Sequence, residues 1–304
     1  MAVTQNPGAQ IVRRRVREYF TAYLYLTPAG LVFLVFTLLP ALFVLYISLF
    51  NWNFLNEALS RWVGIGNYRD LVTSAQFWHS LLITGYFLLG TVPVGVIVAL
   101  LIAMFLMDQV PGRALVRLAV FAPYVTPIVA TSIIWLWIFN PQYGLLNAVL
   151  HLLHLPELGW LQSPHWALVG IIIFTLWHSL GFSVIIFLAG LTGISTELRE
   201  ASRIDGATRL QELRHVVWPL LSPITLFVLV ISTIGALQAF TQFYTMTAGG
   251  PLAATTTTSY LLYTLAFIFY NTGHAAALAV ILFLIIGGLT LVQMGVSRRR
   301  TFYQ

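Results

Sequence analysis

Six long apolar stretches constrain the fold of this sequence more than any other feature. They cover residues 22–50, 79–107, 115–139, 167–191, 220–244 and 274–296, and apart from Arg117 near the start of the third they contain no Asp, Glu or Arg. A helix needs about 20 mostly apolar residues to cross the hydrocarbon core of a bilayer. We therefore predict an all-α polytopic membrane protein with six transmembrane helices.

The composition excludes several classes of protein. Only 8% of the residues are charged, against about a quarter in soluble domains, so lipid must solvate most of the surface. The chain has no Lys, and a Walker A loop needs one to reach the phosphates, so the chain is not its own P-loop ATPase. It has no Cys, which excludes disulfides and thiolate chemistry. The arginines border apolar stretches, so they do not indicate nucleic-acid binding.

The positions of the arginines predict the orientation, because short cytoplasmic loops retain positive charge. Two of the 15, Arg61 and Arg69, lie on one side of the predicted spans. The other side holds Arg13, Arg14, Arg15, Arg17, Arg113, Arg117, Arg199, Arg203, Arg209, Arg214, Arg298, Arg299 and Arg300. We therefore place both termini in the cytoplasm and the chain in a bacterial or archaeal cytoplasmic membrane.

Two shorter apolar segments are predicted outside the spans. Residues 260–270 are too few to cross a bilayer, which indicates a re-entrant or interfacial helix. The stretch "GLLNAVLHLLHLP" places Asn147, His151 and His154 at i, i+4 and i+7 among leucines. This spacing predicts an amphipathic helix on the outer surface, ended by Pro156.

The stretch "ELREASRIDGATRLQELRHVVWP", residues 197–219, interrupts this apolar chain and holds eight of its 24 charged residues. Ser195 or Thr196 can cap a first helix, Gly206 can end it, and the spacing of Thr208 and Gln211 fits a capping box for a second helix running toward Pro219. Helix connections are usually 2 to 8 residues long, so this segment is longer than a simple connection between two spans needs to be. The loop is thus either a surface helical hairpin with paired charges or a docking element for a cytoplasmic partner.

The segment "EASRIDGATRLQELRHVVWP" resembles the EAA loop of permease subunits in binding-protein-dependent ABC importers. Glu200, Ala201, Gly206 and Pro219 fall in register with that family's pattern, whereas Ser202 replaces its second Ala, Val216 its Ile and Trp218 its Leu. Four further stretches resemble the sugar and polyol subgroup typified by maltose and glycerol-3-phosphate importers: "LTPAGLVFLVFTLLPALFVLYISLFNW", "FAPYVTPIVATSIIWLWIFNPQYGLLN", "TAGGP" and "AFIFYNTGHAAALA".

This resemblance implies the type I importer (MetI-like) fold and import of a sugar, oligosaccharide or polyol. The implied partners are a second permease subunit, usually a different one although a homodimer stays open, an ABC ATPase dimer and an external solute-binding protein. ATP and Mg would bind the ATPase, with no cofactor on this chain. The implied ATPase-coupling residues are Glu200, Ala201, Ser202, Asp205, Gly206, Ala207 and Pro219. In the family's arrangement Glu200 would pair with a basic group of the ATPase, and Ala201 would permit close approach.

We divide the chain into a cytoplasmic tail (1–21), a first span with its external loop (22–74), a transmembrane core (75–296) that includes the coupling loop (193–222), and a second cytoplasmic tail (297–304). Within the core, Gln238 and Gln242 lie one turn apart in the predicted fifth span. They either join helices or face the substrate path. Trp177, His178 and Tyr244 are the other candidates for that path.

Two other classes of function compete with the importer. An ion-coupled secondary transporter usually needs ionisable groups within the spans, and His178 is the one candidate. A membrane-embedded enzyme could use a metal held by His151, His154 and Glu157. Those histidines lie on the polar side of a predicted amphipathic helix, so we expect no metal site, and no catalytic constellation stands out.

Overall fold

A computed structural model describes residues 19, 21, 23–52, 59–107 and 112–298. Most of the predicted tail 1–21 lies outside the described residues, as do residues 299–304 of the second tail. Arg13, Arg14, Arg15, Arg17, Arg299 and Arg300 are among those left out.

Five helices in the described residues are long and apolar enough to cross a membrane. They are Tyr23–Ile47, which includes the π-helical turn η1 (Leu34–Leu38) and α2 (Leu39–Ile47), then α4 (Ala75–Met107), α8 (Ala167–Thr192), Leu210–Leu237, and α14 (Thr272–Arg298). The first, second, fourth and sixth predicted spans agree with these bounds to within a few residues. Long apolar stretches were therefore a sufficient signal at those places.

The third predicted span, 115–139, is not one straight helix. It divides into α5 (Arg113–Val125) and α6 (Ile128–Ile138), which are bent by 108°. The break falls at Thr126 and Pro127. Proline disfavours helical backbone in the residue before it, and Thr126 is extended with ψ 145°. Counted as one broken span, the pair brings the number of spans to six.

The fifth predicted span, 220–244, is wrong at both ends. The helix begins at Leu210 and ends at Leu237, running through α10 (Arg209–Glu212), the π-helical turn η4 (Leu213–Val217) and α11 (Trp218–Leu237). Pro219 does not stop it. A proline ring clashes with the carbonyl four residues earlier, and the wider π turn before it, closed by the N–H of Trp218 on the carbonyl of Leu213, gives that ring room.

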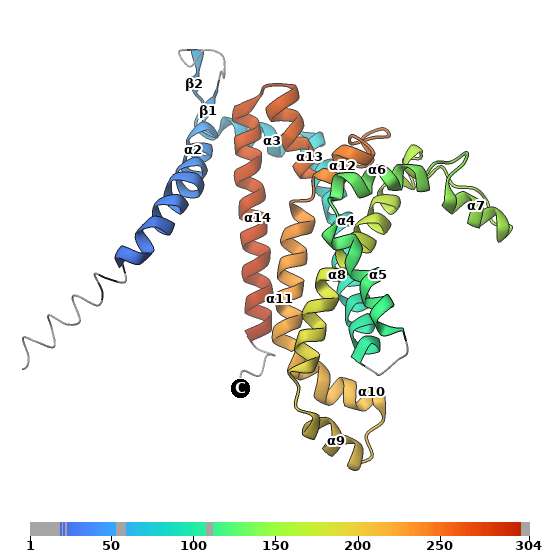
Figure 1. The fold of residues 1–304 in the computed structure, drawn as a ribbon. Helices are drawn as coiled ribbons and strands as arrows, with labels where there is room; N and C mark the ends of the chain where they lie inside the picture. The colour runs from blue at the N-terminus through green and yellow to red at the C-terminus, as the bar shows by residue number, and fades with distance from the viewer. Residues whose placement is uncertain (1–18, 20, 22, 53–58, 108–111, 299–304) are drawn as a thin grey trace, which may run out of the picture.

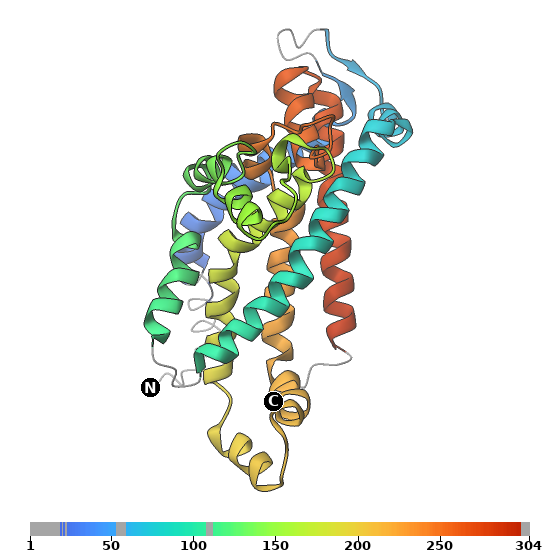
Figure 2. The same cartoon turned by 90° about the vertical axis from the view of Figure 1, so that its right-hand side faces the viewer.

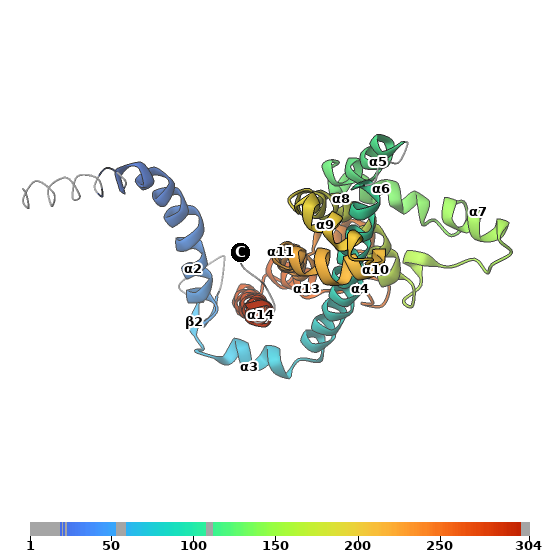
Figure 3. The same cartoon turned by 90° about the horizontal axis from the view of Figure 1, so that it is seen from below.

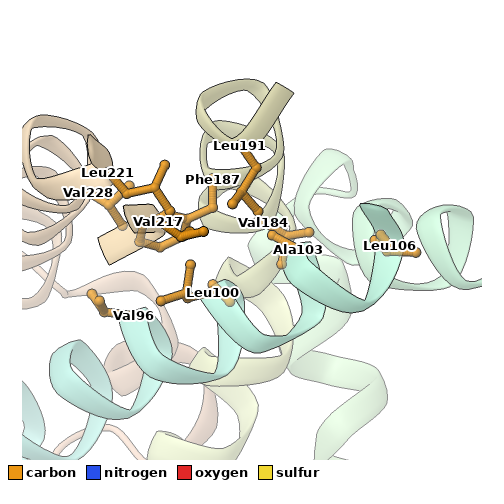
Figure 4. Close-up of a cluster of buried hydrophobic side chains, with 11 residues drawn as sticks. Val96, Leu100, Ala103, Leu106, Val184, Phe187, Leu191, Val217, Leu221 and Val228 are labelled. Atoms are coloured by element: carbon orange, nitrogen blue, oxygen red, sulfur yellow. The ribbon is translucent and has the colours of Figure 1, made fainter. Parts of the chain in front are cut away.

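The spans form a bundle centred on α4, α8 and α11, with α14 and α5 packed at its sides (Figures 1 and 2). Buried residues gather in two main layers along these helices. The loop-side core (Figure 4) takes Val96, Ala99, Leu100, Ala103, Leu106, Val184, Phe187, Leu191, Val217, Leu221 and Val228. The hairpin-side core takes Phe87, Val92, Phe139, Trp160, Ile171, Phe174, Ala236, Ala239, Phe243 and Met246.

The first span lies to one side of this bundle (Figure 3), and its most apolar window has no buried residue. Beyond it, β1 (Phe50–Asn51) pairs antiparallel with β2 (Arg61–Trp62), and α3 (Gly66–Thr73) leads into α4. The side chain of Asn67 ties α3 to the segment that follows the first span, because its Nδ2 donates to the carbonyls of Ser48 and Phe50, each at 2.8 Å.

The bundle has two distinct ends (Figure 1). One carries α9 (Thr196–Ile204), α10 and the start of α5, and we call it the loop end. The other carries β1, β2, α3, α6, α12 (Thr241–Met246) and the short helix formed by α13 (Thr258–Tyr263) and η5 (Thr264–Ile268), and we call it the hairpin end. That short helix covers most of residues 260–270, where the sequence predicted an apolar helix of a re-entrant or interfacial kind.

The predicted amphipathic helix is shorter than expected. Helix α7 covers Leu145–Leu152, so it ends before Pro156, and His154 lies outside it with φ 55°. Asn147 does not face solvent. It is buried, donating to the carbonyls of Pro141 and Leu158 at 2.9 and 3.0 Å and accepting from Trp160 Nε1 at 2.7 Å. Among the described residues, no group of three His, Cys, Asp or Glu could hold a metal ion.

Candidate functional site

The charged loop forms two helices that project beyond the loop end of the bundle (Figures 1 and 2). Its first helix, α9, begins where the hydroxyl of Ser195 accepts the N–H of Glu197 at 3.2 Å. It ends in a Schellman motif, because the N–H of Ala207 donates to the carbonyl of Ser202 at 3.0 Å. Gly206 supplies the left-handed residue this motif requires, with φ 80°. The predicted cap and the predicted glycine turn are both confirmed.

The second helix of the loop begins with the predicted capping box. The N–H of Thr208 donates to Oε1 of Gln211 at 2.8 Å, and the N–H of Gln211 donates to the hydroxyl of Thr208 at 3.4 Å. From here the helix runs to Leu237. The second helix of the loop therefore continues without a break into the fifth span, although α10 lies crosswise to α11 (Figures 1 and 3).

The predicted coupling residues lie on or near the surface of this loop. Glu200, Ala201, Asp205 and Gly206 are exposed, and Ser202, Ala207 and Pro219 are half-buried. Two apolar side chains in the same loop are also strongly exposed, Ile204 at 86% and Leu210 at 72%. An exposed surface that mixes charged and large apolar side chains is suited to binding another protein.

Glu212 lies at the base of the loop and was missed by the sequence analysis. It is 4% exposed and is the one charged residue that is buried among the described residues. Nothing in the sequence distinguishes it from the other charged residues of the loop, since its burial depends on how the second helix packs on the bundle.

A cavity of about 290 Å³ lies between the two packed layers of the bundle. On α4 it is lined within 87–95, on α8 within 175–183 and on α11 within 231–236. The loop-side core lies beyond these positions on all three helices, toward the loop end. On α8 the hairpin-side core lies on the opposite side of them, whereas its members Phe87, Val92 and Ala236 line the cavity themselves.

The lining of this cavity is mostly apolar, with uncharged polar groups among the apolar ones. Its polar residues are Thr91, Tyr124, Thr175, His178, Ser179, Ser183, Ser232 and Gln242, and no Arg, Asp or Glu of the described residues lines it. The Thr175 hydroxyl is buried and has no hydrogen-bond partner among the described residues, although buried polar atoms are normally paired. Single hydroxyls scattered through apolar spans gave no signal in the sequence.

His178 lines the cavity and bonds to the neighbouring span. Its Nε2 lies 3.2 Å from the backbone carbonyl oxygen of Thr126, at the break between α5 and α6. Because a carbonyl oxygen only accepts hydrogen bonds, Nε2 carries the proton. A lone histidine bonded to a neighbouring helix was the alternative to a proton relay, and the geometry favours it.

The five predicted path residues do not gather in one place. His178 and Gln242 line the cavity, whereas Gln238, Trp177 and Tyr244 do not. The helix ends at Leu237, so Gln238 and Gln242 are not one turn apart in a single span. Gln238 is exposed at the end of α11, and Gln242 is buried in α12. Trp177 packs against Trp135, with ring centres 5.2 Å apart.

Tyr244 belongs to an aromatic cluster on the side of α12 away from Gln242. Its ring lies 5.4 Å from Phe240 and 5.2 Å from Tyr263. Hydrogen bonding to Tyr244 raises the pKa of the Tyr263 phenol, which lies in the short helix before the last span. The Tyr263 phenol is therefore a neutral hydrogen-bonding group at physiological pH.

A second hollow, of about 370 Å³, lies at the hairpin end. Its walls come from the "NPQ" turn after α6, the 3₁₀ turn η3 (Trp160–Gln162) and the "TAGGP" loop after α12, and the polar residues Asn140, Gln162 and Thr247 line it. Two of the motifs on which the family resemblance rests thus meet at one surface.

The sequence of residues 91–301 matches the family described as the inner membrane component of binding-protein-dependent transport systems. This chain is a member of that family. The permease is therefore a multi-pass membrane transport subunit, and the predicted membership of the binding-protein-dependent importer family is confirmed.

Similar proteins extend the match over nearly the whole permease. The trehalose/maltose transport system permease protein MalF of Thermococcus litoralis is 33% identical over 290 residues, 94% of this chain and 96% of the relative. A bacterial ABC transporter for import of the acidic polysaccharide alginate has a chain that superposes with TM-score 0.79 at 23% identity, over 96% of this chain and 99% of that one. The same transporter with an alginate pentasaccharide-bound periplasmic protein gives TM-score 0.80. The permease therefore has the type I ABC importer (MetI-like) fold.

Proposed function

We propose that this permease forms half of the translocation path of an ATP-driven importer for a neutral sugar, oligosaccharide or polyol. An external solute-binding protein delivers the solute, and the loop 193–222 couples the path to a separate ATPase dimer. The second half of the path comes from a second permease subunit, which in the expected arrangement has a different sequence.

The observation that carries this proposal is the connection between the loop and the cavity. The helix Leu210–Leu237 begins in the exposed loop and ends beside the cavity, where Ser232 and Gly235 line the wall. A displacement of the loop therefore acts on the wall through the same helix. The loop-side core packs beyond the cavity toward the loop end, and alternate opening and closing of the packing on the two sides of the cavity would give alternating access.

The loop residues have specific roles in this proposal. The exposed carboxylate of Glu200 pairs with a basic group on the ATPase, and exposed Ile204 and Leu210 enter an apolar cleft of that subunit. ATP and Mg bind the ATPase, and closure of the ATPase dimer then displaces the loop. In the proposed orientation, the loop end and both termini lie on the cytoplasmic side. The hollow beside the "TAGGP" loop then faces the solute-binding protein on the opposite side.

The lining of the cavity supports a neutral solute. A ligand with a carboxylate or phosphate needs a cationic or metal partner when it is desolvated, and no Arg in the described part of the chain lines this cavity. Hydroxyl, amide and imidazole groups are the partners that sugar hydroxyls use. The name of the T. litoralis relative refers to trehalose and maltose, which are neutral, whereas the alginate transporter imports an acidic polysaccharide.

Affinity purification from native membranes tests the proposal. The tagged permease should recover a P-loop ATPase, a second permease and a solute-binding protein, and the purified complex should hydrolyse ATP faster when the loaded binding protein is added. The binding protein then identifies the solute, which should be uncharged. Recovery of the permease alone from a preparation that preserves other membrane complexes would contradict the proposal and favour ion coupling.

A further inference from the structure

We infer that His178 is a positioning residue that holds the bend of the third span and makes that bend respond to solute in the cavity. We call the bend at Thr126 and Pro127 the elbow. The inference rests on the proposed function, because it requires a solute to occupy the cavity.

The elbow leaves backbone groups without helical partners. Thr126 is extended and Pro127 has no N–H, so the helical hydrogen-bond ladder is interrupted between α5 and α6. The carbonyl of Thr126 accepts from His178 Nε2 at 3.2 Å. In the described part of the chain, this is the one side-chain hydrogen bond from another span to the elbow. An unpaired carbonyl in the membrane is costly, so this bond favours the bent form.

The same face of α8 also fixes α5 one turn further along. A Cβ at Gly181 would lie 2.7 Å from the Val120 carbonyl oxygen and 3.0 Å from Phe121 Cα. The α5 backbone therefore rests directly on α8 at Gly181, and positions 178 and 181 share a face because they are three residues apart. With α5 fixed in this way, a change at His178 acts on the angle of the elbow.

The second ring nitrogen of His178 connects the elbow to the cavity. With the proton on Nε2, Nδ1 is an acceptor, and among the described residues none donates to it. His178 lines the cavity together with Tyr124 and Ile128, which flank the elbow on either side. A solute hydroxyl that donates to Nδ1 polarises the ring and strengthens the bond from Nε2 to Thr126. An occupied cavity therefore stabilises the bent form more than an empty one.

Spin labels across the elbow can test this in the assembled importer. The chain has no Cys, so Leu118→Cys on α5 and Ile134→Cys on α6, both exposed positions, carry the only labels on this subunit, and any Cys of the partner subunits is replaced first. The measurements are the label-to-label distance distribution, with and without solute-loaded binding protein, and the number of ATP molecules hydrolysed per solute imported. His178→Leu removes the bond and His178→Gln keeps a donor. Gly85→Ala on α4 is the control, because position 85 does not line the cavity and a Cβ there meets nothing within 4 Å.

In the wild type and in Gly85→Ala, the distribution should narrow when solute is supplied. His178→Leu should leave the distance distribution broad with and without solute, and it should raise the ATP hydrolysed per solute imported several-fold. His178→Gln should restore a low number of ATP molecules hydrolysed per solute. A wild-type distribution that does not respond to solute would overturn the inference even if His178→Leu fails to assemble, as would a His178→Leu complex that behaves like the wild type. Failure of the wild-type complex to import with ATP would instead contradict the proposed function.

Discussion

Thr208 and Gln211 close a reciprocal capping box at the start of the helix that continues to Leu237, with the N–H of Thr208 2.8 Å from Oε1 of Gln211. From Gln211 to the cavity residue Ser232 this helix is unbroken along the chain, and it changes direction between α10 and α11 (Figure 1). A force on the exposed loop thus reaches the cavity wall through one continuous element. The capping box fixes where that element begins.

Removing the capping box should loosen the loop without changing the spans. Gln211→Ala should cost roughly 0.5–2 kcal/mol of local helix stability, seen as about 2- to 30-fold faster hydrogen exchange over α10 and as weaker stimulation of ATP hydrolysis by the loaded binding protein. Gln211→Glu keeps an acceptor and is the control. Unchanged exchange in Gln211→Ala would show that contacts with the bundle, and not the cap, hold the start of this helix.

Gly206 should be sensitive to substitution because of its backbone and not because of crowding. It has φ 80°, and a Cβ there would meet nothing within 4 Å. Gly206→Ala should therefore destabilise the turn by about 1 kcal/mol, Gly206→Val by more, and Gly206→Asn by less. Gly85→Ala on α4 is the matched control, since a Cβ there also meets nothing within 4 Å but its φ is not positive. Solute uptake at equal membrane abundance measures the effect, and equal uptake by Gly206→Val and Gly85→Ala would contradict it.

The exposed apolar side chains of the loop should contribute to binding of the ATPase. Ile204→Ser and Leu210→Ser should each weaken ATPase binding about 10- to 100-fold, since burying such a side chain contributes roughly 1.5–3 kcal/mol. Retention of the ATPase subunit during purification measures this. Leu145→Ser, exposed on α7 at the hairpin end, should retain the ATPase fully. Loss of the ATPase in this control as well would indicate a general folding defect.

The close approach at Gly181 should not tolerate a side chain. In Gly181→Ala the new methyl would overlap the backbone of α5, so α5 must move away, and the midpoint of thermal unfolding in detergent should fall by several degrees. Overpacking of this kind usually costs 1–3 kcal/mol. Gly85→Ala is again the control. An unchanged midpoint would mean that α5 is free to shift relative to α8.

The sequence predicted the spans where apolar length alone sets the helix, as in α8, whose bounds differ from the predicted 167–191 by one residue. It also predicted the local chemistry of the loop, because Ser195, Gly206, Thr208 and Gln211 act through their near neighbours. These interactions depend on spacing along the chain and not on packing between distant elements.

The sequence did not predict features that depend on packing. In the third apolar stretch Pro127 predicts a kink, but hydropathy does not change there, so the size of the 108° bend has no signature in the sequence. Gln238 and Gln242 have helical spacing, but the chain leaves the helix after Leu237. Asn147 has the spacing of a polar face, yet it bonds the backbone of residues 141 and 158, which the fold brings beside it.

Solute uptake by proteoliposomes tests the central claim most directly, namely that movement of the loop 193–222 drives a path through this permease. The vesicles would contain the purified importer with ATP on the side of the ATPase, loaded binding protein on the other side, and no proton or sodium gradient. Uptake that requires ATP and is abolished by Gly206→Val, with the ATPase still bound, is the result this account predicts. Uptake that continues without ATP and follows an imposed ion gradient would contradict it.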